Sequence, residues 1–278
     1  MKIAVIGLGL IGGSMAKTLK LHTDATVYGC DLNPETIREA LLVHAIDAEL
    51  TDEALSACDL VLVALYPGTI VEWVKAHAGL FREGCVVIDC GGVKQVIVRE
   101  LQPLAKGWHY IGGHPMAGRE FSGFRYAQDN LYDNASMILT PAEDEDPELL
   151  LRIRDFFVDL GFRRVQLATP REHDEMIAYT SQLAHIVSSA YVKTPLARKN
   201  RGFSAGSFKD MTRVAKLAEG MWTELFFDNR EALLPEVEGL VDRLTAYRDA
   251  LRNEDREAMF QLLKEGREIK ESLEEDGK

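Results

Sequence analysis

Short apolar runs and helix-like stretches alternate along the first part of the chain. The runs are rich in Val, Ile and Leu, which is typical of strands buried on both faces of a sheet. They predict strands over residues 2–6, 26–30, 60–65, 85–90, 108–112, 135–140 and 163–168. The stretches between them have apolar residues at helical spacing and predict helices near 12–21, 34–43, 69–79, 94–105 and 147–160. This alternation predicts an α/β fold with a mostly parallel, doubly wound sheet.

The pattern changes after Pro170, and no further strand is expected beyond it. Helical periodicity dominates the remainder of the chain. It predicts helices over 171–194, 212–227, 229–252 and 254–275, with a loop at 195–208. We therefore expect two domains, a doubly wound sheet over residues 1–168 and an all-helical domain over residues 169–278.

A glycine-rich turn, Gly7 to Gly12, directly follows the first predicted strand and precedes a helical pattern. In a Rossmann-type dinucleotide-binding turn, the first glycine allows the tight turn and the second lets the backbone approach a pyrophosphate. The third glycine lets the helix pack closely on its strand, and the helix N-terminus offers unpaired N–H groups to the phosphates. We therefore expect a Rossmann domain. Its cofactor-binding candidates are Gly7, Gly9, Leu10, Ile11 and Gly12.

Asp31 ends the second predicted strand and lies 19 residues after Gly12. An acidic residue at this place accepts hydrogen bonds from the ribose hydroxyls of a dinucleotide. Its charge also repels the 2′-phosphate of NADP. The glycine turn and Asp31 together predict NAD as the cofactor.

The chain has 278 residues, a net charge of −12 and an isoelectric point of about 5.1. This charge disfavours nucleic acids and anionic membranes as partners, and an anionic substrate would need a local basic pocket. No apolar run approaches the roughly 18 residues of a membrane span. A strand that begins at residue 2 leaves no room for a signal peptide. The four cysteines show no CxxC spacing, so we expect reduced thiols and a cytoplasmic location.

Ligands of open α/β sheets bind beyond the carboxyl ends of the strands. Two predicted strands end near Tyr66, Pro67 and Gly92, which are further cofactor-binding candidates. A third ends on Gly112-Gly113-His114-Pro115, where two glycines suggest a backbone that passes close to a ligand. His114 is the best acid/base candidate because an ordinary histidine pKa near 6.5 suits proton transfer at neutral pH. The alternative is a histidine that only stabilises the turn.

A second cluster is expected on the helix over 171–194. A step of 100° per residue from Asp174 places Ser181 and His185 within about 40° of it, with Gln182 nearby. His173 is expected to make a capping or interdomain hydrogen bond, whereas His185 is as well suited to a binding role as to a structural one. No metal site is expected, because the spacing puts the two histidines about 120° apart.

Cations follow the predicted loop at 195–208. Arg213 could clamp a carboxylate with its planar guanidinium, or it could be a solvated charge near a helix start. Further cations in predicted loops are Arg119, Arg125 and Lys209. Taken singly, each could instead be an ordinary surface charge.

These motifs together resemble the prephenate/arogenate dehydrogenase family of tyrosine biosynthesis. The matching segments run through most of the chain: Gly7 to Ser14, Asp89 to Lys94, Gly113 to Gly118, His173-Asp174, Ser181 to His185, Asp210 to Arg213, and Trp222. The resemblance implies NAD-dependent oxidative decarboxylation of prephenate to 4-hydroxyphenylpyruvate. In this reaction a hydride goes to NAD and the ring carboxylate leaves as CO₂. Arogenate, giving tyrosine, is the alternative substrate.

The resemblance also implies roles for individual residues. His114 would be the catalytic residue that takes the proton of the 4-hydroxyl, and Arg213 would bind the ring carboxylate. His185, with Gln182 nearby, would hold the substrate, and Arg119 or Lys209 would meet its second carboxylate. Family members are usually homodimers paired through the helical domain. The apolar stripe over 229–252 agrees with such a pairing.

The chain departs from the family pattern at two positions. Gly92 stands where many members have a serine thought to assist the catalytic histidine, and Gln182 stands where some members have a histidine. Two rival functions follow from the sequence. One is another NAD-dependent dehydrogenase, of the β-hydroxyacid type, that relies on a lysine such as Lys193 or Lys209. The other is a non-catalytic NAD-binding sensor.

Overall fold

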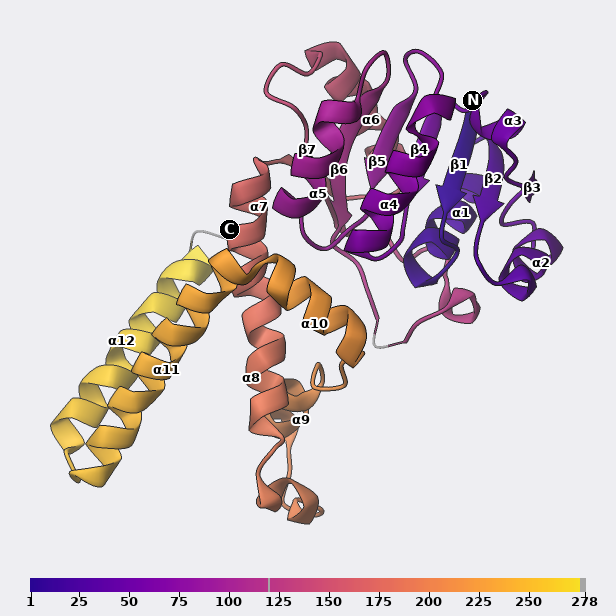
Figure 1. Cartoon of the computed structure of the whole chain (residues 1–278). Coiled ribbons are helices and arrows are strands. Elements are labelled where there is room, and N and C mark those ends of the chain that lie inside the picture. Colours follow the sequence, from indigo (N-terminus) through magenta and orange to yellow (C-terminus); the bar gives the residue numbers. More distant parts are fainter. Residues whose placement is uncertain (120, 276–278) are drawn as a thin grey trace. The chain divides into compact units, whose positions relative to one another are not determined.

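The computed structural model describes residues 1–119 and 121–275. Eight strands form one sheet in the order β3-β2-β1-β4-β5-β6-β7-β8 (Figure 1). Every neighbouring pair is parallel except β6 and β7. The strands are β1 (Lys2–Ile6), β2 (Thr26–Cys30), β3 (Ala48–Glu49), β4 (Leu60–Val63), β5 (Val86–Asp89), β6 (His109–Pro115), β7 (Ser136–Thr140) and β8 (Arg164–Leu167). The predicted mostly parallel, doubly wound sheet is confirmed.

Two features of the sheet differ from the prediction. The two-residue β3 was missed, because so short a strand leaves no alternating pattern. β6 continues to Pro115, whereas the predicted strand ended at residue 112. Glycine and proline disfavour a strand by themselves. Here the antiparallel ladder with β7, in which His114 faces Ile138, holds this segment extended.

Helices cover both faces of the sheet and create two cores (Figure 1). Alternate residues of β1 point to opposite faces, so Ile3 and Val5 enter one core while Ala4 and Ile6 enter the other. The helices are α1 (Leu10–His22), α2 (Pro34–Leu42), α3 (Asp52–Leu55), α4 (Pro67–His77), α5 (Gln95–Leu101) and α6 (Pro147–Asp159), with 3₁₀ turns at Ala78–Leu80, Gln102–Leu104 and Phe124–Tyr126.

The remaining described chain is helical, as predicted. Its elements are α7 (Pro170–Ile177), a π-helical turn η4 (Ala178–Leu183), α8 (Ala184–Tyr191), a 3₁₀ helix at Pro195–Lys199, α9 (Gly206–Thr212), α10 (Glu219–Asp228), α11 (Arg230–Arg252) and α12 (Arg256–Glu275). The predicted helix over 212–227 was wrong in its first part, since α9 ends at Thr212 and α10 begins only at Glu219. Val214, Leu217 and Met221 imitate a helical face, so periodicity could not place this break.

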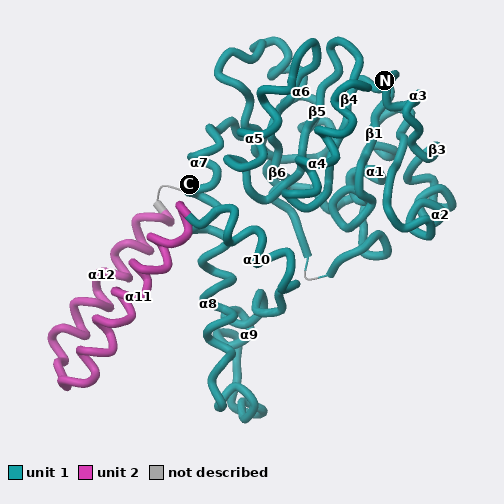
Figure 2. The backbone as a smooth tube through the Cα atoms, in the orientation of Figure 1, with its two compact units in different colours: residues 1–230 teal, residues 231–278 magenta. Residues whose placement is uncertain are grey.

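The chain forms two compact units, residues 1–230 and 231–278 (Figure 2). The first contains the sheet with α1 to α10, and the second is a hairpin of α11 and α12, within which the Tyr247 hydroxyl donates to the Leu262 carbonyl at 3.2 Å. The predicted domain boundary at 168/169 is a different division and stays a prediction. Across the described residues, none of the helices combines the length and apolarity needed to cross a bilayer.

Candidate active site

The glycine turn after β1 leaves room for a ligand at the start of α1. Gly7 has a φ of +82°, and its N–H donates to the Cys30 carbonyl at 2.8 Å. A Cβ on Gly12 would collide with the Gly7 carbonyl oxygen, whereas a Cβ on Gly9 would meet nothing within 4 Å. No side chain among the described residues caps α1. Open space beside unpaired helix N–H groups fits the pyrophosphate of a dinucleotide.

Asp31 lies directly beyond β2 and is held by two backbone donors. Its Oδ2 accepts from Leu8 N at 2.8 Å, and its Oδ1 accepts from Asn33 N at 2.9 Å. The carboxylate is only half-buried. Because a carboxylate can accept about four hydrogen bonds, these two leave capacity for ribose hydroxyls. The arrangement therefore fits the role that the sequence predicts for Asp31.

His114 begins a chain of hydrogen bonds at the carboxyl-end side of the sheet. Its Nδ1 lies 2.8 Å from Nε2 of His173, and His173 Nδ1 lies 2.7 Å from Oδ1 of Asp174. Asp174 also accepts from the backbone N–H groups of Lys94 and Gln95, at 2.7 and 2.8 Å. His173 therefore does not cap its helix. Thr169 does so, through a capping box with Glu172.

Near His114 lies a buried ion pair between the two ends of the matching segment Asp89 to Lys94, a pairing that the sequence did not predict. Lys94 and Asp89 are both 0% exposed and form a salt bridge, and the Tyr110 hydroxyl donates to Asp89 Oδ2 at 2.7 Å. Burial holds the pKa of His114 well below its ordinary value, and the neighbouring His173 and Lys94 lower it further. His114 is consequently neutral at neutral pH and able to accept a proton. A lysine five residues after a strand-end aspartate was the available signal.

The two glycines before His114 serve packing, and the expected close approach to a ligand stays a prediction. A Cβ on Gly113 would overlap the Asp89 carbonyl oxygen. A Cβ on Gly112 would overlap the Thr140 hydroxyl and lie 3.2 Å from Lys94 Cδ. Glycine is therefore needed so that β6 can pass close to β5, to β7 and to the Lys94 side chain.

His185, Trp222 and Arg213 form a second cluster. The His185 ring lies 4.0 Å from the Trp222 ring between centroids, and its Nδ1 is 2.8 Å from the Ser181 carbonyl oxygen. Because that oxygen only accepts, Nδ1 donates and Nε2 keeps its lone pair. Burial lowers the pKa of His185. The Ser181 carbonyl raises it, and the nearby Arg213 charge lowers it further. A cation near an imidazole that stacks with an indole suits an anionic cyclic ligand.

Two sequence profiles of one enzyme family match consecutive parts of the chain. The first, described as prephenate dehydrogenase, nucleotide-binding domain, matches residues 15–166. The second, described as prephenate dehydrogenase, dimerization domain, matches residues 169–265. The chain belongs to the prephenate dehydrogenase family. The resemblance noted from the sequence motifs is thereby confirmed.

Individual relatives are similar over nearly the whole chain. A Bacillus subtilis prephenate dehydrogenase is 29% identical over 283 residues, which cover 98% of this chain and 76% of the relative. The A. aeolicus prephenate dehydrogenase, crystallised with hydroxyphenyl propionate and NAD⁺, is 31% identical with a TM-score of 0.87, covering 98% of both chains. Arogenate dehydrogenase from Synechocystis is 26% identical with a TM-score of 0.83, covering 98% of this chain and 100% of that one.

In this member of the prephenate dehydrogenase family, Gln182 is committed to internal hydrogen bonds. It is 2% exposed; its Nε2 donates to the Leu225 carbonyl at 3.1 Å, and its Oε1 accepts from Asn229 Nδ2 at 2.8 Å. The predicted contact of Gln182 with the substrate stays a prediction. The predicted grouping of Asp174 with His185 does not appear, because η4 is π-helical and a step of 100° per residue fails across it.

The other candidates are the cations Arg119, Arg125 and Lys209. Arg119 and Lys209 are exposed, and Arg125 lies over the Tyr126 ring at 5.0 Å. Across residues 1–119 and 121–275, neither Arg119 nor Lys209 is shown hydrogen-bonded to His114 or His185. Their proposed contact with a second carboxylate stays a prediction.

The strand-end candidates lie where α10 meets the sheet. Tyr66 precedes α4 and is 55% exposed, and Pro67 is the first residue of that helix. The next N–H, of Gly68, donates to Glu224 Oε1 at 2.8 Å. A Cβ on Gly92 would lie 3.3 Å from Leu225 Cδ2, so α10 packs against this part of the predicted cofactor site.

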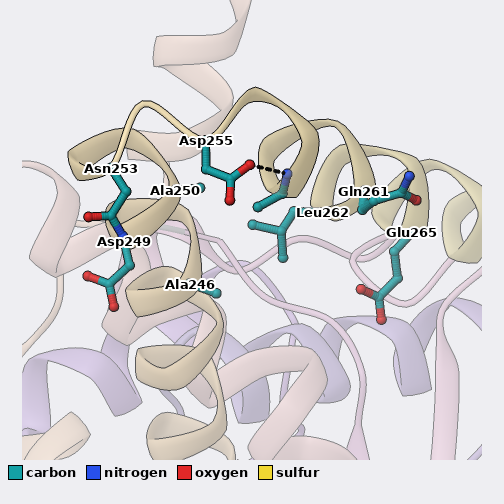
Figure 3. A pocket seen from close by; sticks show the side chains of 9 residues that line it. Ala246, Asp249, Ala250, Asn253, Asp255, Gln261, Leu262 and Glu265 are labelled. Carbon is teal, nitrogen blue, oxygen red and sulfur yellow. Dashed lines mark hydrogen bonds between the residues drawn. The ribbon is translucent and has the colours of Figure 1, made fainter.

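Two cavities share no lining residue with either cluster. One, of about 410 Å³, occupies the turn between α11 and α12, where Asp255 Oδ1 accepts from Ala258 N at 2.9 Å (Figure 3). The other, of about 510 Å³, is lined mainly by Tyr191, Leu196, Phe203 and Phe208. Neither includes a residue predicted to act in catalysis or binding.

Proposed function

We propose that this protein catalyses the NAD-dependent oxidative decarboxylation of prephenate to 4-hydroxyphenylpyruvate. The observation that carries the proposal is the hydrogen bond of His114 to His173 at the carboxyl-end side of a Rossmann sheet whose glycine turn fits a dinucleotide. Membership of the prephenate dehydrogenase family and the similarity to an enzyme crystallised with NAD⁺ support it. The same membership removes the support for a β-hydroxyacid dehydrogenase.

The residues assigned to NAD are the glycine turn and Asp31. Gly9, Leu10 and Ile11 would hold the pyrophosphate, and Asp31 would accept from the ribose hydroxyls. NAD, when bound, accepts the hydride released from the substrate. Tyr66, Pro67 and Gly92 line the neighbouring strand ends and stay candidates for further contacts.

His114 would act as the general base. Its depressed pKa keeps the imidazole neutral, so it can take the proton of the 4-hydroxyl as that carbon becomes a carbonyl. The ring then loses its carboxylate as CO₂, and aromatisation drives the reaction. His114 is the residue for which base chemistry is both geometrically and electrostatically supported.

Arg213, with His185 and Trp222, would bind the substrate. The guanidinium would pair with the ring carboxylate and the two rings would contact the substrate ring. Arg119 and Lys209 are the candidates for the carboxylate of the pyruvyl side chain. Such a local group of cations is needed because a dianion must approach a chain of net charge −12.

The test is NADH formation by the purified protein with NAD and either prephenate or arogenate. Turnover of prephenate is expected, and the His114→Asn variant should lose a factor of about 10² or more in kcat while still binding NAD. Turnover of arogenate alone would support the same mechanism with arogenate as the substrate in place of prephenate. NAD binding without turnover of either compound would refute the proposal and favour the sensor.

We further propose that the protein is a homodimer paired through its helical part. The family profile over residues 169–265 is that of a dimerization domain. Val241, Leu244 and Leu251 of α11 are 54%, 58% and 70% exposed, and such a row of apolar side chains suits a partner subunit. Sedimentation should give twice the chain mass of 31.0 kDa. The expected cytoplasmic location stays a prediction.

A further inference from the structure

The hydrogen bonds from Asp174 to His114 have one possible direction. The backbone N–H groups of Lys94 and Gln95 can only donate, so both Asp174 oxygens act as acceptors toward them. His173 Nδ1, at 2.7 Å from Oδ1, must therefore be the donor in its bond to Asp174. Neutral His173 then keeps a lone pair on Nε2. At 2.8 Å from that lone pair, His114 Nδ1 must be the donor in turn.

We propose that His173 and Asp174 are positioning residues that hold His114 in the tautomer with hydrogen on Nδ1 and a lone pair on Nε2. This inference rests on the proposed function of His114 as the base. A free imidazole exchanges between two tautomers, and only one presents Nε2 as a proton acceptor. The buried pair removes the other tautomer and also fixes the plane of the ring.

The same pair stabilises His114 after proton transfer. The proton of the substrate hydroxyl forms a bond to His114 Nε2, and the imidazole becomes an imidazolium whose Nδ1–H still donates to His173. No proton has to move farther, because His173 remains neutral with its own Nδ1–H on Asp174. The carboxylate of Asp174, 0% exposed, then lies one ring away from the new positive charge.

His173 is the better position for a test, because Asp174 also has structural duties. Asp174 accepts the two N–H groups at the start of α5, and its carbonyl accepts from Asn229 Nδ2 at 2.8 Å. A change at Asp174 would therefore disturb several elements at once. Among the residues that the structure describes, His173 in contrast uses its two ring nitrogens only on Asp174 and His114.

The matched pair of variants is His173→Gln and His173→Met. Their side chains have the same length, but only glutamine carries an oxygen that can accept from His114 Nδ1–H. We expect kcat to fall by about 10²-fold in the methionine variant and by roughly 10-fold or less in the glutamine variant, with KM for NAD unchanged in both. Equal losses of kcat in the two variants would show that a hydrogen bond from His114 Nδ1–H to residue 173 does not contribute to catalysis.

A double-mutant cycle separates positioning from a structural contribution. If His173 acts through His114, then His173→Met should lower kcat in the wild type but cause no further loss in the His114→Asn background. Asparagine keeps a donor toward residue 173 and removes the base. An equal fractional loss in both backgrounds would mean a structural effect, and the positioning role would be refuted.

A measurement without substrate keeps this inference separate from the proposed function. Nitrogen NMR of the imidazoles should show His114 and His173 both as neutral Nδ1–H tautomers, and His173→Met should let His114 populate Nε2–H. His114 as the Nε2–H tautomer in the wild type would overturn the inference even if prephenate is turned over. Absence of turnover with the predicted tautomers would overturn only the proposed reaction.

Discussion

Replacement of Gln182 by methionine decides whether this side chain binds substrate or holds the fold. Methionine has a similar volume and shape, so the change removes polar atoms without creating a cavity. In the structure it deletes the bond donated to the Leu225 carbonyl and the bond accepted from Asn229 Nδ2. Each partner group keeps another hydrogen bond. Leu225 still accepts from Asn229 N at 3.2 Å, and Asn229 Nδ2 still donates to the Asp174 carbonyl.

The expected cost follows from this count of bonds. Two buried hydrogen bonds at about 0.5–1.5 kcal/mol each give a loss of roughly 1–3 kcal/mol in the free energy of unfolding. The lower half of that range is expected because both partners keep another hydrogen bond. For a chain of this size, each kcal/mol lowers the melting temperature by about 2–4 °C. The KM for prephenate should stay within about twofold, since the amide is 2% exposed and both its polar atoms are used in internal hydrogen bonds.

The assay compares urea unfolding and steady-state kinetics of the wild type and the variant at one protein concentration, because subunit association shifts apparent stability. Gln166→Met is the matched control. This glutamine is exposed on β8, so the same substitution should change the free energy of unfolding by less than about 0.5 kcal/mol. Unchanged stability together with a KM raised tenfold or more for Gln182→Met would refute the structural role and restore the predicted substrate contact.

Three further outcomes are expected. Gly92→Ser should lower the free energy of unfolding by less than about 1 kcal/mol and leave kcat unchanged, because the new Cβ meets only the flexible end of Leu225. A steep drop in the urea midpoint would show that the Leu225 side chain cannot move aside. Asp31→Ser should raise the ratio of kcat/KM for NADP over NAD by about tenfold or more, and a wild type that already uses both cofactors would refute the ribose argument. Burial holds the pKa values of His114 and His173 below the value near 6.5 that they regain on unfolding, so the unfolded chain binds more protons below pH 6.5. The urea midpoint should therefore fall as pH drops from about 6.5 toward the folded-state pKa values, and a midpoint independent of pH in that range would contradict the assignment.

Local signals in the sequence were sufficient to predict the Rossmann sheet and its dinucleotide-binding turn. The glycine turn, Asp31 and the alternation of strands and helices are patterns of neighbouring residues, and each requires only the backbone geometry of a βαβ unit. The caps behave in the same way. Asn33 accepts from the N–H of Glu35 and Asp146 from the N–H of Glu148, each across a proline that has no N–H of its own. The same locality made His114 identifiable as a strand-end histidine.

Only the tertiary structure decided what His114 and Gln182 touch. His173 lies 59 positions after His114, and nothing in the periodicity of α7 indicates that its ring accepts from a residue of β6. The π-helical turn changes the angular step along this helix, and here Gln182 makes hydrogen bonds with Leu225 and Asn229. Patterns in a sequence report the preferences of residues that lie within one or two helical turns of each other. Contacts between distant segments depend on how elements pack, and packing is settled by the buried shape and hydrogen-bond partners of the whole domain.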